Sequence, residues 1–446
     1  MAIVTNLQSP ISFSVTLREE GSPSQAIFVR CMILKHSLQD IQGRAAEAER
    51  ERPRPKIAIV TETFFPEING VANTLRYVSE GLSRQYRVQV VRPNQPPGEK
   101  RELIDAMEHI LVRGRPIPGY GDLKFGLPCR RRLLKAWRQD TPSAVYVATQ
   151  GPLGWSAVSA ATALGVPVIS GFHTNFHSYS AFYGFGWLTK LITRYLTWFH
   201  HRTLLTLTPT RQTAEAVSEM GVRNTRVWSR GVDCSQFNPS LRCQQLREEW
   251  GVREESPVFI YVGRLASEKN IHLAIAAFRR AQQQVSKARM VMVGGGPLRE
   301  RIAAKHPDII LAGVKRGDDL ARHYASADIF LFPSLTDTFG NVVLEAMASG
   351  LGIVSFDDAA AREHLEHEVS GMLAPQQDCD AFCRHALTLA LRPSHLKRLR
   401  AAARGRALPL DWSQIVDRFA HILLSGEAKG EQQHESAKSL RAVSPS

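Results

Sequence analysis

Residues 333–350, with the sequence PSLTDTFGNVVLEAMASG, decide the fold of this chain of 446 residues. The apolar run from Ile329 to Phe332 before them predicts a buried strand of a parallel sheet, and Pro333 ends that strand. A helix is predicted from Asn341 to Ala348. A strand, a loop and a helix in this order form the unit from which parallel α/β sheets are built.

Two carboxylates, Asp337 and Glu345, stand eight positions apart around the start of this helix. Glu345 is the only charged residue in a helix that is apolar almost all the way round, so we expect it to be buried and to need a partner. Unpaired backbone N–H groups and the positive end of the dipole favour a phosphate at the helix start. The residues there are Thr338, Phe339, Gly340 and Asn341. A helix cap and a structural salt bridge are the alternative roles of the two carboxylates.

The stretch resembles the E-x7-E signature of retaining glycosyltransferases with two Rossmann-like domains, the GT-B fold, in glycosyltransferase family 4. Residues 64–71 (FFPEINGV), 172–176 (FHTNF) and 336–350 look most like bacterial GDP-mannose-dependent α-mannosyltransferases. The resemblance covers about residues 56–424. It is imperfect at three places: Asp337 replaces the first Glu, Gly352 stands where proline is common, and Ser229-Arg230-Gly231 replaces the frequent Pro-Asn-Gly. We expect the last two differences to lie outside the donor site.

A pair of cations follows the predicted strand of residues 258–262. Arg264 and Lys269 stand at consecutive element ends, at the carboxyl edge of a parallel sheet, where ligands bind in such folds. Arginine can hold a phosphate through two parallel hydrogen bonds, and lysine adds a compact charge. Two unrelated surface cations are the alternative.

The resemblance implies a role for each of five catalytic residues. Glu345 would hold the donor ribose, Asp337 the hydroxyls of the sugar, and Arg264 and Lys269 the diphosphate. His173 would contact the donor sugar and steady positive charge at its anomeric carbon. The departing phosphate would accept the proton of the acceptor in a front-face substitution, so positioning and electrostatic stabilisation would supply most of the catalysis.

Glycine turns complete the expected donor site. Gly295 and Gly296 follow the predicted strand of residues 290–293, and a tight turn there brings backbone close to a ligand. By the resemblance this turn lies beside the nucleoside, with residues 310–314 framing the base. The turn is not G-x-G-x-x-G, which disfavours an NAD-dependent oxidoreductase. Gly70 follows the first strand and would offer a backbone N–H to phosphate from the other side of the cleft, unless it is a plain turn glycine.

Two runs of alternating strands and helices predict an α/β fold with two Rossmann-like parallel-sheet domains facing across a cleft. The first run has strands near residues 56–61, 87–91, 144–148 and 166–170, and the second near 258–262, 290–293, 329–332 and 352–356. We expect a mobile N-terminal extension (1–54), an acceptor-side domain (55–235), a donor domain (236–408), a terminal segment (409–424) whose helix, residues 412–424, returns to the first domain, and a disordered tail (425–446).

The formal charge of +14 calls for acidic partners. Basic residues concentrate in residues 113–138, where Asp122 is the only acid; a solvated surface and contact with anionic lipid are both open. In residues 187–199 core packing is favoured over an interfacial membrane helix. The chain has no motif that reads RNA or DNA, so we expect no nucleic-acid partner.

Six cysteines without a C-x2-C pair indicate reduced thiols. There is no secretory leader pattern, and the apolar segments are too short to span a bilayer. We therefore expect a cytoplasmic protein, with at most peripheral contact with the inner face of the cell membrane. Asp378-Cys379-Asp380 is the only D-x-D match, and Asp378 stands at a predicted helix start as a cap. No metal cofactor is expected, as is usual for the GT-B fold.

These observations predict a retaining hexosyltransferase that moves an α-mannosyl group from GDP-mannose onto a lipid or glycan hydroxyl, in glycolipid or polysaccharide biosynthesis. A UDP-hexose donor is the first alternative. A sugar-nucleotide epimerase of the same fold and a nucleic-acid-binding protein are further ones.

Overall fold

The computed structural model describes residues 54–65, 67, 70–94, 107–117, 120–173, 186–252, 256–334, 337 and 339–425. The chain divides into two units, Met1–Arg54 and Pro55–Ser446, and all that follows concerns the second unit.

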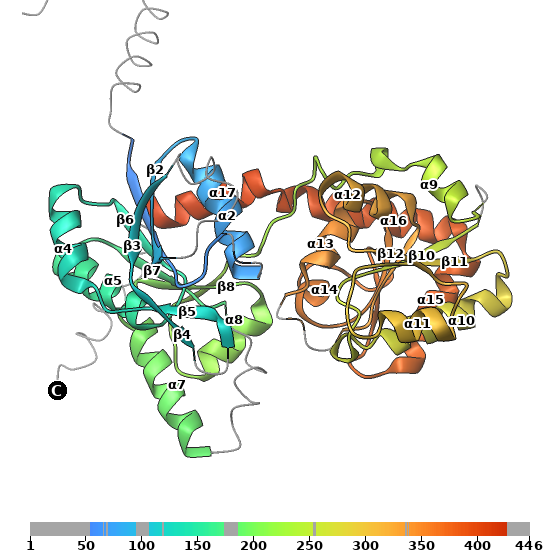
Figure 1. Cartoon of the computed structure of the whole chain (residues 1–446), viewed down its shortest axis with the longest axis horizontal. Helices are drawn as coiled ribbons and strands as arrows, with labels where there is room; N and C mark the ends of the chain where they lie inside the picture. Colours follow the sequence, from blue (N-terminus) through green and yellow to red (C-terminus); the bar gives the residue numbers. More distant parts are fainter. Residues whose placement is uncertain are drawn as a thin grey trace, which may run out of the picture. The chain divides into compact units, whose positions relative to one another are not determined.

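Seven parallel strands form the first sheet, in the order β3-β2-β1-β6-β7-β8-β9 (Figure 1). They are β1 (Lys56–Val60), β2 (Arg87–Pro93), β3 (Glu108–Val112), β6 (Ala144–Val147), β7 (Val168–Gly171), β8 (Leu205–Thr208) and β9 (Thr225–Val227). The side chains of the inner strand β1 enter two cores in turn, because successive side chains of a strand point to opposite faces. Ile57 and Ile59 pack into the core that holds Leu75, whereas Ala58 and Val60 pack into the core that holds Leu153.

Helices around the first sheet supply those cores and a smaller one that holds Val217. They are α2 (Gly70–Ser83), α4 (Arg130–Gln139), α5 (Pro152–Ala163), α7 (Gly186–His200) and α8 (Arg211–Glu219). An antiparallel hairpin of β4 (Gly114–Ile117) and β5 (Tyr120–Gly126) precedes α4. The basic stretch of residues 113–138 is therefore a hairpin and a helix.

Six parallel strands form the second sheet, in the order β12-β11-β10-β13-β14-β15. They are β10 (Val258–Val262), β11 (Arg289–Val293), β12 (Ile310–Gly313), β13 (Ile329–Phe332), β14 (Gly352–Phe356) and β15 (Met372–Ala374). The accompanying helices are η1 (Pro239–Leu241), α9 (Gln244–Glu249), η2 (Ser267–Lys269), α10 (Ile271–Gln284), α11 (Arg299–Lys305), α12 (Gly317–Ser326), α13 (Asn341–Ala348), α14 (Ala359–His364), α15 (Cys379–Leu391), α16 (Pro393–Ala407) and η3 (Leu408–Leu410).

The last helix, α17 (Trp412–Leu424), lies beside α2 of the first sheet (Figure 1). Trp412 stacks on Tyr77 with ring centroids 4.9 Å apart, and Phe419 packs edge-on against Tyr146 at 4.8 Å. A Cβ on Gly81 would stand 2.7 Å from Val416, so the two helices are in close contact. The end of the described chain thus completes the core of the first sheet.

The predicted strands of residues 258–262, 329–332 and 352–356 and the helices of residues 341–348 and 412–424 are confirmed to the residue. The preference for core packing in α7 is wrong for two of the side chains expected in the core, because Leu191 and Tyr195 are 54% and 40% exposed, whereas Phe199 is buried. Trp198 of the same helix is 37% exposed. The four boundaries between the five expected segments remain predictions.

Candidate donor site

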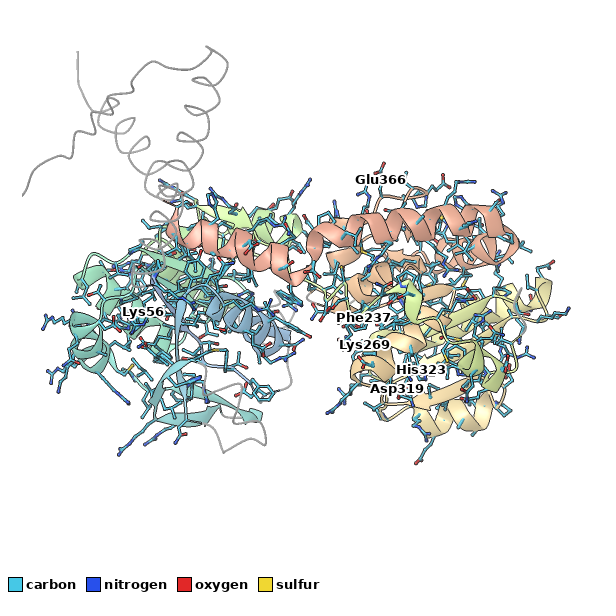
Figure 2. The ribbon with its side chains drawn as sticks, turned by 90° about the horizontal axis from the view of Figure 1, so that it is seen from above. Lys56, Phe237, Lys269, Asp319, His323 and Glu366 are labelled. Carbon is cyan, nitrogen blue, oxygen red and sulfur yellow. The ribbon has the colours of Figure 1, made fainter. Side chains whose placement is uncertain are left out.

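Lys269 and Asp337, predicted from separate motifs, form an ion pair. The Lys269 Nζ lies 2.7 Å from the Asp337 Oδ1, and the two side chains are 22% and 25% exposed. Lys269 ends η2, and Figure 2 shows it among the elements of the second sheet. The next residue, Asn270, has a left-handed backbone (φ 52°) and donates from Nδ2 to the Pro333 carbonyl at 3.4 Å. This contact joins the loop after β10 to the loop after β13.

Arg264 belongs to the same loop but makes a different contact. Its Nη1 lies 3.4 Å from the Glu268 Oε1, and its side chain is 66% exposed. The Tyr261 hydroxyl donates to the Arg264 carbonyl at 3.0 Å and so holds the backbone beneath the guanidinium. An exposed pair of this kind contributes little to stability, so Arg264 can exchange Glu268 for a ligand at small cost.

The start of α13 depends on Gly340. Its φ of 84° lies in the left-handed region, and a Cβ there would stand 2.9 Å from the Phe332 ring. Phe339 is 1% exposed and packs edge-on against His364. The Phe339 side chain is thus core, and only its backbone can contribute to a ligand site. Thr338 lies outside the described residues.

Glu345 is only partly buried, contrary to the expectation. The buried face of α13 consists of Val343, Leu344, Ala346, Met347 and Ala348, and Glu345 lies with Asn341 and Val342 on the partly exposed face. The expected partner exists: the Tyr324 hydroxyl of α12 donates to Glu345 Oε2 at 2.9 Å. Loss of water raises the pKa of Glu345 to about 7, and the Tyr324 hydrogen bond partly opposes that rise.

The glycine turn after β11 brings backbone close to another part of the same chain. A Cβ on Gly294 would stand 1.9 Å from the Gly263 carbonyl oxygen, and one on Gly296 would stand 2.4 Å from that of Leu265. The Leu265 N–H donates to the Gly295 carbonyl at 2.8 Å. The turn therefore supports the loop that carries Arg264. Contact of Gly295 and Gly296 with a nucleoside stays a prediction.

His173 follows β7 and is hydrogen-bonded to Tyr146. Its Nε2 lies 2.6 Å from the Tyr146 hydroxyl, and its Nδ1 is buried without a partner among the described residues. Burial, and then the charge of Arg230, lower the pKa of His173 to about 3. The imidazole is therefore neutral at physiological pH.

Arg230 was expected from the sequence to lie outside the donor site, but the structure places it beside residues predicted to form that site. Its Nη1 is 3.4 Å from the Asn341 Oδ1, at the start of α13. The same nitrogen would stand 2.7 Å from a Cβ on Gly70, the first residue of α2. Gly70 thus leaves room for a guanidinium. The signal that could have identified Arg230 is the replacement of Pro-Asn-Gly by Ser-Arg-Gly.

The single D-x-D match is a helix cap, as predicted: Asp378 Oδ1 accepts the Ala381 N–H at 2.8 Å at the start of α15. Among the described residues no group of three or more His, Cys, Asp or Glu side chains could hold a metal ion. Metal independence remains a prediction.

Comparison with known proteins identifies the family. Residues 68–236 match the family model "Glycosyltransferase Family 4", and residues 256–391 match "Glycosyl transferases group 1". The GDP-mannose-dependent alpha-mannosyltransferase of Mycobacterium tuberculosis is 33% identical over 370 residues, which are 81% of this chain and 94% of that protein. The chain belongs to glycosyltransferase family 4. It is a retaining hexosyltransferase that uses a nucleotide-sugar donor, so the predicted family and enzyme class are confirmed.

More distant relatives of this family 4 enzyme differ in their sugar. The alpha-monoglucosyldiacylglycerol synthase of Streptococcus pneumoniae is 23% identical over 331 residues, 71% of this chain and 75% of that protein. The crystal structure of Anabaena HepE in complex with UDP and glucose superposes with a TM-score of 0.64 at 20% identity, over 83% of this chain and all of that one. The GT-B fold is thereby confirmed. Across the described ranges, no helix is both long and apolar enough to cross a bilayer.

Proposed function

We propose that this glycosyltransferase moves an α-mannosyl group from GDP-mannose onto a hydroxyl of a lipid or glycan acceptor. The observation that carries the donor is the 33% identity to the GDP-mannose-dependent alpha-mannosyltransferase of Mycobacterium tuberculosis, over 94% of its length. The name of the streptococcal relative, a synthase of glucosyldiacylglycerol, supports a lipid acceptor.

The diphosphate of the donor binds where the loop after β10 meets the start of α13. Lys269 gives up part of its contact with Asp337 and binds a phosphate oxygen. Arg264 breaks its contact with Glu268 and donates two parallel hydrogen bonds to the phosphate. Gly340 and Asn341 present the first N–H groups of α13. Asp337, which Lys269 holds by their ion pair, accepts hydrogen bonds from the hydroxyls of the sugar.

The ribose binds at Glu345. Two ribose hydroxyls donate to its carboxylate, and hydrogen bonds to the charged form lower the pKa of Glu345 from about 7. His173 faces the sugar as a neutral imidazole, in keeping with its lowered pKa.

The reaction breaks the bond between the anomeric carbon and the phosphate oxygen. The acceptor oxygen forms the new bond on the same face, and its proton passes to the departing phosphate. The protein contributes position and charge stabilisation, because neither Asp337 nor Glu345 needs to attack.

The acceptor reaches the site from the side of the first sheet, at the inner face of a membrane. The polar face of α4 is basic and exposed, with Arg130, Arg131, Arg132, Lys135 and Arg138. On α7 the exposed Leu191, Tyr195 and Trp198 accompany the exposed Lys190 and Arg194. Basic and aromatic side chains of this kind bind anionic lipid surfaces.

A donor screen tests the proposed substrate. The full chain is incubated with GDP-mannose, GDP, UDP-glucose and UDP, and thermal unfolding is followed with each. Protection by GDP and GDP-mannose, and mannosyl transfer to lipid extracts from GDP-mannose alone, are expected. If only UDP-glucose protects the protein and supports transfer, the donor is UDP-glucose and the proposed mannosyl donor is wrong.

Substitutions test the proposed roles. Arg264→Ala and Lys269→Ala are expected to weaken nucleotide binding and turnover together, each by about tenfold to a hundredfold, since hydrogen bonds to charged groups contribute about 1.5–3 kcal/mol. Glu345→Ala is expected to abolish transfer in a protein that still unfolds cooperatively. Normal transfer by Glu345→Ala would contradict the assignment.

A further inference from the structure

Arg230 is a buried cation without an acidic partner among the described residues. It is 6% exposed, and its Nε is buried without a hydrogen-bond acceptor. The buried Arg247, by contrast, has an acidic partner: its Nη1 lies 3.1 Å from Asp328 Oδ2 and also donates to the Ser326 carbonyl. Buried arginines are almost always paired, since an isolated charge loses its hydration without compensation. The burial of Arg230 without an acidic partner among the described residues therefore needs an explanation.

The surroundings of Arg230 favour an anion. Its Nη1 lies 3.4 Å from the Asn341 Oδ1, and its guanidinium lies 5.2 Å from the centre of the Phe339 ring. Gly70, where α2 begins, has no side chain to occupy the space beside the same Nη1. The start of α13, with the positive end of its dipole, thus lies beside one buried cation, and Gly70 at the start of α2 leaves space next to it.

The described groups of the first sheet that neighbour Arg230 supply no negative charge. His173 is neutral, its Nδ1 is buried without a partner, and burial keeps the Tyr146 hydroxyl protonated by raising its pKa. Burial likewise lowers the pKa of Arg230 to about 10, so it stays charged at pH 7. Among the residues that the structure describes, none therefore compensates the positive charge of Arg230.

We propose that Arg230 is a third cation of the donor site, whose guanidinium binds the diphosphate of the nucleotide sugar from the side opposite Arg264 and Lys269. The proposal rests on the proposed donor site at the start of α13. Arginine suits the position, because its planar fork can hold two phosphate oxygens while its face stays on Phe339. As the anomeric bond breaks, Arg230 stabilises the charge that develops on the departing phosphate.

A stability signature separates this role from a structural one. A structural arginine stabilises the unliganded fold, whereas a ligand-binding cation held without a partner weakens it. Arg230→Met keeps the apolar stem and removes the charge, so we expect an unchanged or higher melting temperature without nucleotide. We expect the Kd for GDP to rise about tenfold to a hundredfold. Arg230→Lys should recover part of the affinity.

The matched control is Arg242→Met. The Nη2 of Arg242 lies 2.9 Å from Asp328 Oδ1, and the side chain also donates to the Ala327 carbonyl. This variant should lower the melting temperature without nucleotide and leave the Kd for GDP unchanged. A fall in melting temperature for Arg230→Met as large as that for Arg242→Met, with wild-type affinity for GDP, would show that Arg230 is structural and would overturn the proposal.

Titration calorimetry with GDP, UDP and guanosine, in the absence of any acceptor, identifies the group that Arg230 binds. Weaker binding of GDP or UDP with guanosine unaffected supports the diphosphate. If GDP binding is normal and only the KM of the acceptor rises, Arg230 binds an anion of the acceptor and the inference as stated is wrong. Lys269→Met separates failure of the Arg230 inference from failure of the proposed donor site. If Lys269→Met weakens GDP binding and Arg230→Met does not, only the inference about Arg230 is wrong. If neither variant weakens GDP binding, the proposed donor site is wrong.

Discussion

At the scale of single residues, the titration of Glu345 links structure to donor binding. In the unliganded protein its pKa is raised to about 7 by loss of water, and the Tyr324 hydroxyl donates to the charged form. Only the ionised carboxylate accepts hydrogen bonds from both ribose hydroxyls at full strength. The kcat/KM for the donor should therefore rise with pH through about 7.

Tyr324→Phe tests that relation. Removing the hydroxyl takes away the hydrogen bond that favours the carboxylate, so the pKa of Glu345 rises further and the midpoint of the profile should move to higher pH. The measurement is the pH dependence of kcat/KM for wild type and variant. A midpoint at an unchanged or lower pH would show that Glu345 does not determine the pH dependence of kcat/KM.

His173 makes stability itself depend on pH. Its folded-state pKa of about 3 lies below the ordinary value of 6.5, so the unfolded chain binds more protons between those values. The stability contribution is complete above pH 6.5 and is lost as pH falls toward 3. The free energy of unfolding should drop by up to about 3 kcal/mol from this residue between pH 6.5 and pH 4.

His173→Gln should flatten that dependence. Denaturant unfolding at several pH values measures it, with His201→Gln as the control for loss of an exposed histidine. An equally steep fall in the His173→Gln variant would assign the acid sensitivity to other groups.

At the scale of elements, the glycine turn after β11 and the loop after β10 act as one support for Arg264. Gly294→Ala would place a Cβ 1.9 Å from the Gly263 carbonyl oxygen, and backbone cannot yield as a flexible side chain would. We expect a loss of more than about 2 kcal/mol of stability, together with weaker GDP binding because the Arg264 loop shifts.

Gly317→Ala is the matched control for strain alone. Its φ of 53° is also left-handed, but no atom lies within 4 Å of the added Cβ. The expected cost is about 1 kcal/mol, with unchanged GDP affinity. Denaturant unfolding and calorimetry compare the two variants, and equal effects would mean that the close approach of the two loops is unimportant.

At the scale of the whole molecule, Asp328 joins several elements of the second sheet. Its carboxylate lies within 3.2 Å of nitrogens of three arginines, of which Arg242 and Arg247 come before the sheet in the chain and Arg400 after it. It also accepts the Val258 N–H at the start of β10 at 2.9 Å. Removing this acid would leave the buried Arg247 and the partly exposed Arg242 and Arg400 without their acidic partner.

Asp328→Ala should therefore destabilise the fold by about 3–5 kcal/mol in denaturant unfolding. Asp308→Ala is the control, because Asp308 is 49% exposed where it pairs with Arg279 and such a pair contributes at most about 1 kcal/mol. Similar losses in the two variants would argue against the buried network.

What could be predicted followed from local pattern. Apolar runs bounded by proline and glycine placed β10, β13, β14, α13 and α17 to the residue, because burial on both faces leaves a continuous apolar signature. Short strands such as β9 and β15, three residues each, carry too little pattern to be recognised. The exposure of Leu191 and Tyr195 was not predicted, because the same apolar pattern along a helix arises whether protein or another phase covers that face.

By itself the sequence determined the α/β class, the order of the motifs and the family, since these depend on residue types at fixed short spacings. Only the tertiary structure decided which groups meet. Tyr324 reaches Glu345, Lys269 pairs with Asp337, and Arg230 lies against Asn341 although 111 positions separate them. Such partners are chosen by the packing of whole elements and by the cost of burying charge, and neither is encoded at a fixed spacing along the chain.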